Sequence, residues 1–203
     1  IDRISNFYET EFSNVGRSVH TLAVKATNRF EATRDIVKKY INAKYREEII
    51  FTKGATEAIN LVAATFGEKY INQGDEILIT ELEHHSNYVP WHFLRTKKKA
   101  VIKFAPVNKN GEVEIDEIKK LISSKTKIIA LTHISNVTGA ILPIKKIVDL
   151  AKEKKIPVLV DGTQGAPHLQ IDMQELGCDF YAISCHKMYG PNGLGILYAK
   201  KNG

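Results

Sequence analysis

The sequence predicts an α/β fold in which helices flank a mostly parallel β-sheet. Short apolar runs of strand length alternate along the chain with longer segments whose apolar side chains recur at helical spacing. The chemically unusual polar residues fall directly after the apolar runs. Ligands of open α/β sheets bind at the carboxyl ends of the strands, so this placement predicts a single site at one edge of the sheet.

The N-terminal part is predicted to become helical after a mixed start. Residues 1–18 carry aromatic side chains without a clear period, and apolar residues then follow helical spacing between positions 22 and 41. We expect residues 1–45 to form an N-terminal segment with a long helix, and residues 46–203 to form the main domain.

The main domain is predicted to contain seven strands joined by helices. The predicted strands are 49–52, 77–80, 101–104, 128–132, 158–160, 180–183 and 195–199. Helices are predicted after the turn at 53–57 and at 88–95, 115–122 and 144–154. A glycine-rich bend at 190–195 separates the last two strands.

Composition and charge exclude several classes of function. The chain has 203 residues, of which 43% are hydrophobic, as in globular proteins. Its net charge of +6 comes from 29 basic and 23 acidic residues, and the basic residues occur in small groups typical of solvated helix ends. We therefore expect no nucleic-acid partner. No apolar run is long enough to cross a bilayer, so we expect no membrane partner.

The cysteines and the chain ends bear on the compartment. Cys178 and Cys185 lack the spacing of a CxxC motif, and free thiols suit a reducing compartment. We expect a cytoplasmic protein, with a plastid-type organelle as the alternative because the chain starts at Ile1 rather than Met. We also expect both ends to be cuts within a longer protein, with a C-terminal small domain outside the chain.

Three strand ends carry candidate ligands for a small molecule. Gly54-Ala55-Thr56-Glu57 precedes a helix, where free N–H groups bind phosphate, although for this motif alone a plain helix cap with Thr56 as the cap residue is the commoner arrangement. Asp161 follows a buried strand and suits a ring N–H partner, with Gln164 near a ring hydroxyl; a turn aspartate is the alternative. Lys187 is presented at a bend, where a partly buried amine becomes a nucleophile able to form a Schiff base.

The loop between the second and third predicted strands contains adjacent histidines. His84 could stack on an aromatic ring, ligate a metal with His85, or lie in a surface loop. No HxH or HExxH spacing occurs, so no metal site is expected. The glycines at 190–195 precede a strand instead of opening a helix, and no GxxxxGK[ST] motif occurs, which argues against dinucleotide-binding and P-loop sites.

Five ordered motifs together resemble one family, the class V pyridoxal-phosphate enzymes, and within it the cysteine desulfurases of the Suf type. The resemblance covers nearly the whole chain. The motifs are Gly54-Ala55-Thr56-Glu57-Ala58-Ile59-Asn60, Glu83-His84-His85-Ser86-Asn87-Tyr88-Val89-Pro90-Trp91, Thr132-His133-Ile134-Ser135-Asn136-Val137-Thr138-Gly139, Val160-Asp161-Gly162-Thr163-Gln164 and Ser184-Cys185-His186-Lys187-Met188-Tyr189-Gly190-Pro191-Asn192-Gly193-Leu194-Gly195. It implies the large, cofactor-binding domain of the fold type I pyridoxal-phosphate transferases, with a seven-stranded sheet that is parallel apart from its last strand.

The resemblance also implies a role for each matching residue. Lys187 would hold pyridoxal 5'-phosphate through a Schiff base and shuttle the substrate α-proton, with His84 stacked on the ring. Asp161 would pair with the ring nitrogen and Gln164 with the ring hydroxyl. The remaining assignments are the phosphate ligands Ala55 (through its backbone), Thr56, Ser184 and His186, then Asn136 near the ring hydroxyl and the substrate carboxylate, and His20 at the substrate entrance.

The implied activity is removal of sulfur from L-cysteine, giving L-alanine and an enzyme persulfide for iron–sulfur cluster assembly. The implied partners are L-cysteine, a sulfur-acceptor protein of the Suf type and a second subunit in a homodimer. The family's persulfide cysteine and carboxylate-binding arginine have no counterpart in the chain, and neither Cys178 nor Cys185 matches that loop. Another class V enzyme, such as a selenocysteine lyase, kynureninase or aminotransferase, is the alternative, as is a non-catalytic fragment.

Overall fold

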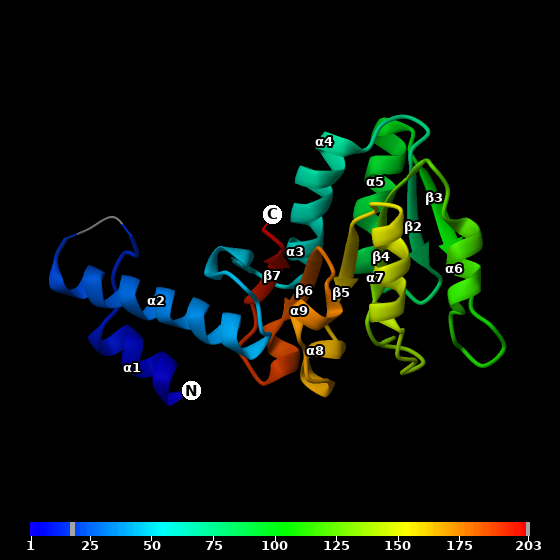
Figure 1. Ribbon diagram of the computed structural model, residues 1–203. Helices are drawn as coiled ribbons and strands as arrows, with labels where there is room; N and C mark the ends of the chain where they lie inside the picture. The colour runs from blue at the N-terminus through cyan, green and yellow to red at the C-terminus, as the bar shows by residue number, and fades with distance from the viewer. Residues whose placement is uncertain (17–18, 202–203) are drawn as a thin grey trace.

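The computed structural model, which describes residues 1–16 and 19–201, is built on one sheet of seven strands (Figure 1). The order across the sheet is β1-β7-β6-β5-β4-β2-β3, and only β7 runs antiparallel to its neighbours. The strands are β1 (Ile49–Thr52), β2 (Glu76–Thr80), β3 (Val101–Ala105), β4 (Thr126–Thr132), β5 (Val158–Asp161), β6 (Phe180–Ser184) and β7 (Gly195–Ala199). All seven predicted strands are therefore confirmed to within two residues at each end.

Helices connect the strands. The α-helices are α1 (Asp2–Thr10), α2 (Thr21–Tyr40), α3 (Ala55–Val62), α4 (Glu68–Tyr70), α5 (Val89–Lys98), α6 (Ile115–Leu121), α7 (Ile144–Glu153), α8 (Gly165–His168) and α9 (Met173–Leu176). Short 3₁₀ turns occur at η1 (Arg46–Glu48), η3 (His85–Asn87) and η4 (Cys185–Met188), and a π-helical segment, η2 (Ala63–Gly67), joins α3 to α4.

Each face of the sheet packs against its own set of helices. In β2, Leu78 belongs to one buried cluster, whereas Ile77 and Ile79 belong to the other, because successive side chains of a strand point to opposite faces. The cluster with Leu78 includes residues of α6, α7 and α9, and the cluster with Ile77 includes residues of α3 and α5. Burial on both faces explains why the strands appear in the sequence as continuous apolar runs.

The N-terminal helices project from the sheet as an arm (Figure 1). Only Ala23 and Ala26 are buried in α2, but the residue that follows it, Ile41, lies in the main core. The sequence did not predict α1. Its Tyr8 ring stacks on that of Phe12 at 5.3 Å, and these aromatic residues carry no helical period that reaches the core. A division of the chain at residue 45 stays a prediction.

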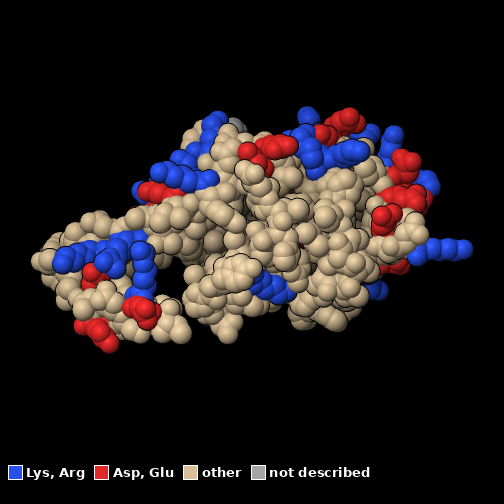
Figure 2. All heavy atoms as spheres, turned by 90° about the horizontal axis from the view of Figure 1, so that it is seen from below, with Lys and Arg blue, Asp and Glu red and all other residues tan. Residues whose placement is uncertain are grey.

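Charged side chains of both signs share the molecular surface. On the face shown in Figure 2, Lys and Arg lie among Asp and Glu instead of forming a patch of one sign. Ion pairs such as Lys145–Asp149 and Lys120–Glu117 occur within exposed helix faces. Within the described part of the chain, no helix is both long and apolar enough to cross a membrane.

Gly195 at the start of β7 lies against the backbone of the turn before α3. A Cβ atom at Gly195 would lie 2.4 Å from the Gly54 Cα atom, closer than any packing allows. We expect Gly195→Ala to lower the free energy of unfolding by about 1–3 kcal/mol, because the backbone of Gly54 has to move. Chemical denaturation measures the change.

Gly67→Ala is the matched control for that substitution. Its Cβ would also meet an atom at 2.4 Å, but that atom is Leu94 Cδ1, at the tip of a flexible side chain. We expect a smaller loss of stability for Gly67→Ala than for Gly195→Ala. Equal losses would contradict the close approach of β7 to the turn.

Candidate active site

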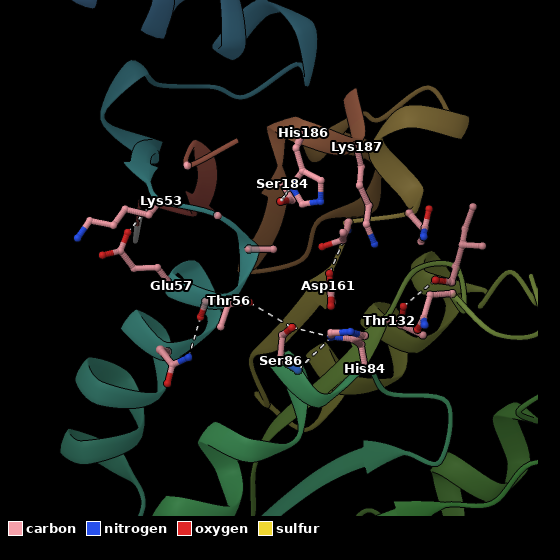
Figure 3. A pocket seen from close by; sticks show the side chains of 18 residues that line it. Lys53, Thr56, Glu57, His84, Ser86, Thr132, Asp161, Ser184, His186 and Lys187 are labelled. Carbon is pink, nitrogen blue, oxygen red and sulfur yellow. Dashed lines mark hydrogen bonds between the residues drawn. The ribbon is translucent and has the colours of Figure 1, made fainter. Parts of the chain in front are cut away.

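One cavity of about 790 Å³ lies at the carboxyl ends of β1, β4, β5 and β6 (Figure 3). Small-molecule sites have volumes of roughly 300–1,000 Å³. Every predicted site residue except His20 lines the cavity: Ala55, Thr56, His84, Asn136, Asp161, Gln164, Ser184, His186 and Lys187. The prediction that these separated motifs meet at one edge of the sheet is confirmed.

The N-terminus of α3 forms one wall of the cavity. Gly54 occupies the N-cap position without a side-chain cap, and the first hydrogen bond of the helix runs from Ala58 N to Gly54 O at 3.1 Å. The N–H groups of the first turn have no acceptor within the helix, so they can donate to a bound anion. Thr56 lies inside α3, so its interpretation as a cap residue is wrong.

Side-chain donors extend this wall. Ser184, at the end of β6, is buried, and its Oγ lies 2.9 Å from His186 Nδ1. A Cβ at Gly54 would lie 3.8 Å from Ser184 Oγ, which places the hydroxyl beside the turn before α3. We call these groups, with Ala55 and Thr56, the anion cradle. Its hydroxyl, imidazole and main-chain N–H groups suit a phosphate.

Asp161 ends β5 at the floor of the cavity and is 4% exposed. Its Oδ1 accepts a hydrogen bond from Thr163 N at 3.0 Å. Within residues 1–16 and 19–201, no protein group donates a hydrogen bond to its Oδ2. A buried carboxylate with one oxygen directed to a cavity favours a cationic N–H partner there.

Lys187 enters the cavity from η4, the turn that follows β6. Tyr189 ends this turn in a left-handed conformation with φ of 61°, and Gly190 N donates to Cys185 O at 2.9 Å, which closes the turn. The half-buried Lys187 side chain points toward Asp161 in Figure 3. The bend thus presents a primary amine to the cavity.

His84 faces the cavity from the turn before η3, and its ring orientation is fixed locally. Ser86 N donates to His84 Nδ1 at 3.2 Å, and Ser86 Oγ lies 2.6 Å from the same nitrogen. Thr56 Oγ1 donates to Ser86 Oγ at 3.2 Å, which links His84 to the anion cradle. Because Nδ1 accepts, the neutral ring carries its proton on Nε2. Sequence reasoning missed Ser86, whose only signal is its place two residues after His84.

The adjacent histidines do not share a ligand. The ring planes of His84 and His85 are 89° apart, and His85 lines a different cavity. Among the described residues, no group of three or more His, Cys, Asp or Glu side chains is arranged to hold a metal ion. His84 lines the main cavity, whereas His85 does not.

The last two predicted cavity residues come from neighbouring turns, whereas His20 lies elsewhere. Gln164 is at the N-cap position of α8, and Asn136 is exposed on the turn after β4. His20 caps the distal end of α2, where its Nδ1 accepts from Ala23 N at 3.3 Å. The structure does not bring His20 to the cavity.

The two cysteines do not line the cavity. Cys178 is fully buried, and burial raises the pKa of its thiol to about 12. Burial also raises the pKa of Cys185 above its ordinary value. Thiolates, and not thiols, are the nucleophiles of cysteine chemistry, so neither residue is suited to attack a sulfur atom.

Glu83, next to His84, is a further residue that sequence reasoning missed. Burial is the main cause that raises the pKa of its carboxyl from 4.5 to about 8, with a smaller contribution from the charge of Asp161. The folded protein therefore holds a proton that the unfolded chain releases above about pH 4.5. The stabilisation that Glu83 contributes is fully present below about pH 4.5 and is lost as the pH rises through about 8.

That shift gives a testable pH dependence. We expect the free energy of unfolding of the wild type, measured relative to Glu83→Gln, to fall by on the order of 2–5 kcal/mol between about pH 4.5 and pH 8.5. Urea denaturation at several pH values measures the difference. A difference that stays constant across this range would show that Glu83 keeps an ordinary pKa.

The comparisons with known proteins agree with this geometry. The profile of the family described as aminotransferase class-V matches residues 1–203. The chain belongs to the class V aminotransferase family. A protein of Halalkalibacterium halodurans named probable cysteine desulfurase is 49% identical over 201 residues, which are 99% of this chain and 50% of that protein. A cysteine desulfurase of Synechococcus elongatus is 46% identical over 99% of this chain and 32% of its own length.

Solved structures of cysteine desulfurases share the fold of this class V member. The cysteine desulfurase CsdA of Escherichia coli aligns with a TM-score of 0.89 at 38% identity, over 98% of this chain and 50% of that one. A cysteine desulfurase of Thermococcus onnurineus aligns with a TM-score of 0.93 at 35% identity, over 98% of this chain and 50% of that one. The predicted fold type I architecture is confirmed. The chain spans about half or less of the length of the relatives it matches.

Proposed function

We propose that the cavity binds pyridoxal 5'-phosphate and that the protein is a cysteine desulfurase. One observation carries the proposal. The amine of Lys187 and the carboxylate of Asp161 face one cavity, together with the anion cradle. An amine, an anionic partner for a ring nitrogen and a phosphate site are the three groups that this cofactor requires.

The residues present fit the cofactor. The unpaired Oδ2 of Asp161 suits a protonated pyridine nitrogen, and the cradle at α3 suits the phosphate. In Figure 3, His84 lies beside Ser86, and Asp161 lies between His84 and Lys187. This position suits stacking of His84 on a bound ring. We assign Gln164 and Asn136 to the ring hydroxyl, and Asn136 also to the substrate carboxylate.

The cofactor, when bound, stabilises negative charge that develops at the substrate α-carbon. Asp161 would keep the ring nitrogen protonated, because an adjacent carboxylate favours the charged form of that nitrogen. Lys187 would bind the cofactor through its amine and, when displaced by the substrate amine, move the α-proton. Ser184, His186, Thr56 and the backbone at Ala55 would fix the phosphate.

L-Cysteine is the substrate that we propose. Relatives named cysteine desulfurase support it, as does a neighbour with a TM-score of 0.90 and 27% identity whose title is SspA in complex with cysteine. The products would be L-alanine and an enzyme persulfide. Because burial raises the pKa of the thiols of Cys178 and Cys185, we assign the persulfide to a different cysteine. A homodimer, a Suf-type acceptor protein and delivery to iron–sulfur cluster assembly complete the proposal.

The test uses the protein at its natural length, reconstituted with pyridoxal phosphate. We expect a yellow protein that forms alanine from L-cysteine and releases sulfide in the presence of a thiol reductant. Selenide release without sulfide release, or transfer of the amino group to a keto acid, would instead support another class V activity. A yellow protein that leaves L-cysteine intact would overturn the desulfurase assignment but not the cofactor site.

A further inference from the structure

The carboxyl group of Glu83 joins three segments, two of which, β4 and η3, contribute residues to the cavity. Its Oε1 accepts hydrogen bonds from Thr80 Oγ1 at 2.6 Å and from Thr132 N at 3.0 Å. Its Oε2 accepts from Asn87 Nδ2 at 2.6 Å. The residue as a whole is half-buried, but the carboxyl is its inward part, bonded on both oxygens. One side chain therefore connects the ends of β2 and β4 with η3.

The bond to Thr132 takes the place of a strand-to-strand hydrogen bond. The pairing of β2 with β4 ends at Leu78 opposite Ile129, although β4 continues to Thr132. Thr132 lines the cavity, and its Oγ1 donates to Ile134 O at 2.8 Å. Glu83 therefore holds the end of β4 on the side of β2, where the pairing of these two strands has stopped. On the other side, β5 still pairs with β4 as far as Thr132 opposite Asp161.

The bond to Asn87 has a fixed direction. Trp91 Nε1, which can only donate, bonds to Asn87 Oδ1 at 3.1 Å, and both residues are fully buried. The Asn87 amide must then present Nδ2 to Glu83. Asn87 N also donates to His84 O at 2.8 Å, which ties the main chain of His84 to the same unit.

We propose that Glu83 is a positioning residue, which holds the segment carrying His84 and Ser86 against the wall that follows β4. Its effect on the site is to fix the ring of His84 relative to Asp161 and Lys187. The inference deepens the proposed function and rests on it where the cofactor is concerned. Glu83 itself does not line the cavity.

Glutamine cannot replace Glu83 in this unit. Thr132 N–H and the Asn87 NH₂ group are donors of fixed direction that meet different oxygens of Glu83. A carboxyl oxygen accepts a hydrogen bond whether or not it carries the proton, whereas a glutamine offers one accepting oxygen and an NH₂ group that only donates. One of these donors would therefore face another donor. Because the site is buried, that mismatch is costly, and the segment with His84 is expected to shift.

A second substitution restores the pairing. When Glu83→Gln is combined with Asn87→Asp, the carboxylate introduced by the second change accepts from both Trp91 Nε1 and the new glutamine NH₂ group. The glutamine oxygen then accepts from Thr132 N. Glu81→Gln is the matched control, since Glu81 precedes the same turn and its side chain, among the described residues, accepts a hydrogen bond only from Val107 N, at 3.0 Å.

The experiment measures the placement of the ring and not stability alone. In the protein at its natural length, we expect Glu83→Gln to weaken cofactor binding about 5-fold or more and to halve the visible circular dichroism per bound cofactor. Measurements are made at a temperature where each variant is fully folded. Asn87→Asp, added to Glu83→Gln, is expected to recover at least half of each loss, and Glu81→Gln to change neither quantity.

A second readout needs no cofactor. Ring ¹⁵N NMR of neutral His84 is expected to show the Nε2–H form in the wild type and a shift toward the average of both tautomers in Glu83→Gln. Unchanged dichroism, affinity and ring shifts in a less stable Glu83→Gln would overturn the inference. A wild type that binds no cofactor, but whose His84 shifts still respond to Glu83→Gln, would overturn the proposed function and leave Glu83 as a positioning residue.

Discussion

Replacing Lys187 by alanine is expected to abolish the visible absorbance of the reconstituted protein and to lower the rate of alanine formation by about 10³-fold or more. Lys187 is half-buried at the bend after β6, and its amine points to the floor of the cavity, where Asp161 lies. The variant loses both the covalent attachment of the cofactor and the group that moves the α-proton.

Two measurements distinguish the loss of the Lys187 amine from damage to the fold: the stability of Lys187→Ala and the activity of a second lysine variant. Lys187 makes no ion pair with any described residue, so we expect Lys187→Ala to change the free energy of unfolding by less than about 1 kcal/mol. Lys119→Ala, on the exposed face of α6, serves as the control and should keep colour and activity. A yellow, active Lys187→Ala would contradict the assignment.

Replacing Asp161 by asparagine is expected to lower kcat about 10²- to 10³-fold while the protein still folds. The amide oxygen of asparagine can keep the bond from Thr163 N, because only one oxygen of Asp161 makes it. The negative charge at the other oxygen is lost, and the ring nitrogen then has no anion to hold its proton. Steady-state kinetics with saturating cofactor measure the effect.

Asp179→Asn is the control for the loss of a carboxylate at a strand end. Asp179 Oδ2 accepts from Val158 N at 2.9 Å, so it bonds a main-chain N–H group as Asp161 does, but at the opposite end of β5. We expect Asp179→Asn to affect stability and to leave kcat within about twofold. Equal losses of kcat in both variants would show that Asp161 acts only through the fold.

Much of the fold could be predicted because the strands are buried on both faces and appear as apolar runs. The site could be predicted because polar residues follow those runs, as Asp161 follows 158–160 and Lys187 follows β6. What the sequence lacked was a sign for contacts between distant segments. Glu83 bonds Thr132, which is 49 residues away, and no period or motif marks that pair.

The position of His20 in the folded protein was also not predictable from the sequence. The family resemblance implied a residue at the substrate entrance, whereas in the structure His20 caps the distal end of α2, on an arm that projects from the sheet (Figure 1). A helix period predicts that a helix forms, not where its ends lie. Short helices such as α9 were missed for a related reason, since a cap like Asp172 serves only one turn.

Covalent trapping tests the central claim most directly. The reconstituted protein is treated with borohydride, which fixes the bond between the cofactor and an amine, and the digested peptides are analysed by mass spectrometry. We expect the cofactor on Lys187 alone, in near-stoichiometric amount, with no labelling in Lys187→Ala. Labelling of another lysine, or no labelling of a folded wild type, would contradict the assignment of this cavity as a pyridoxal-phosphate site.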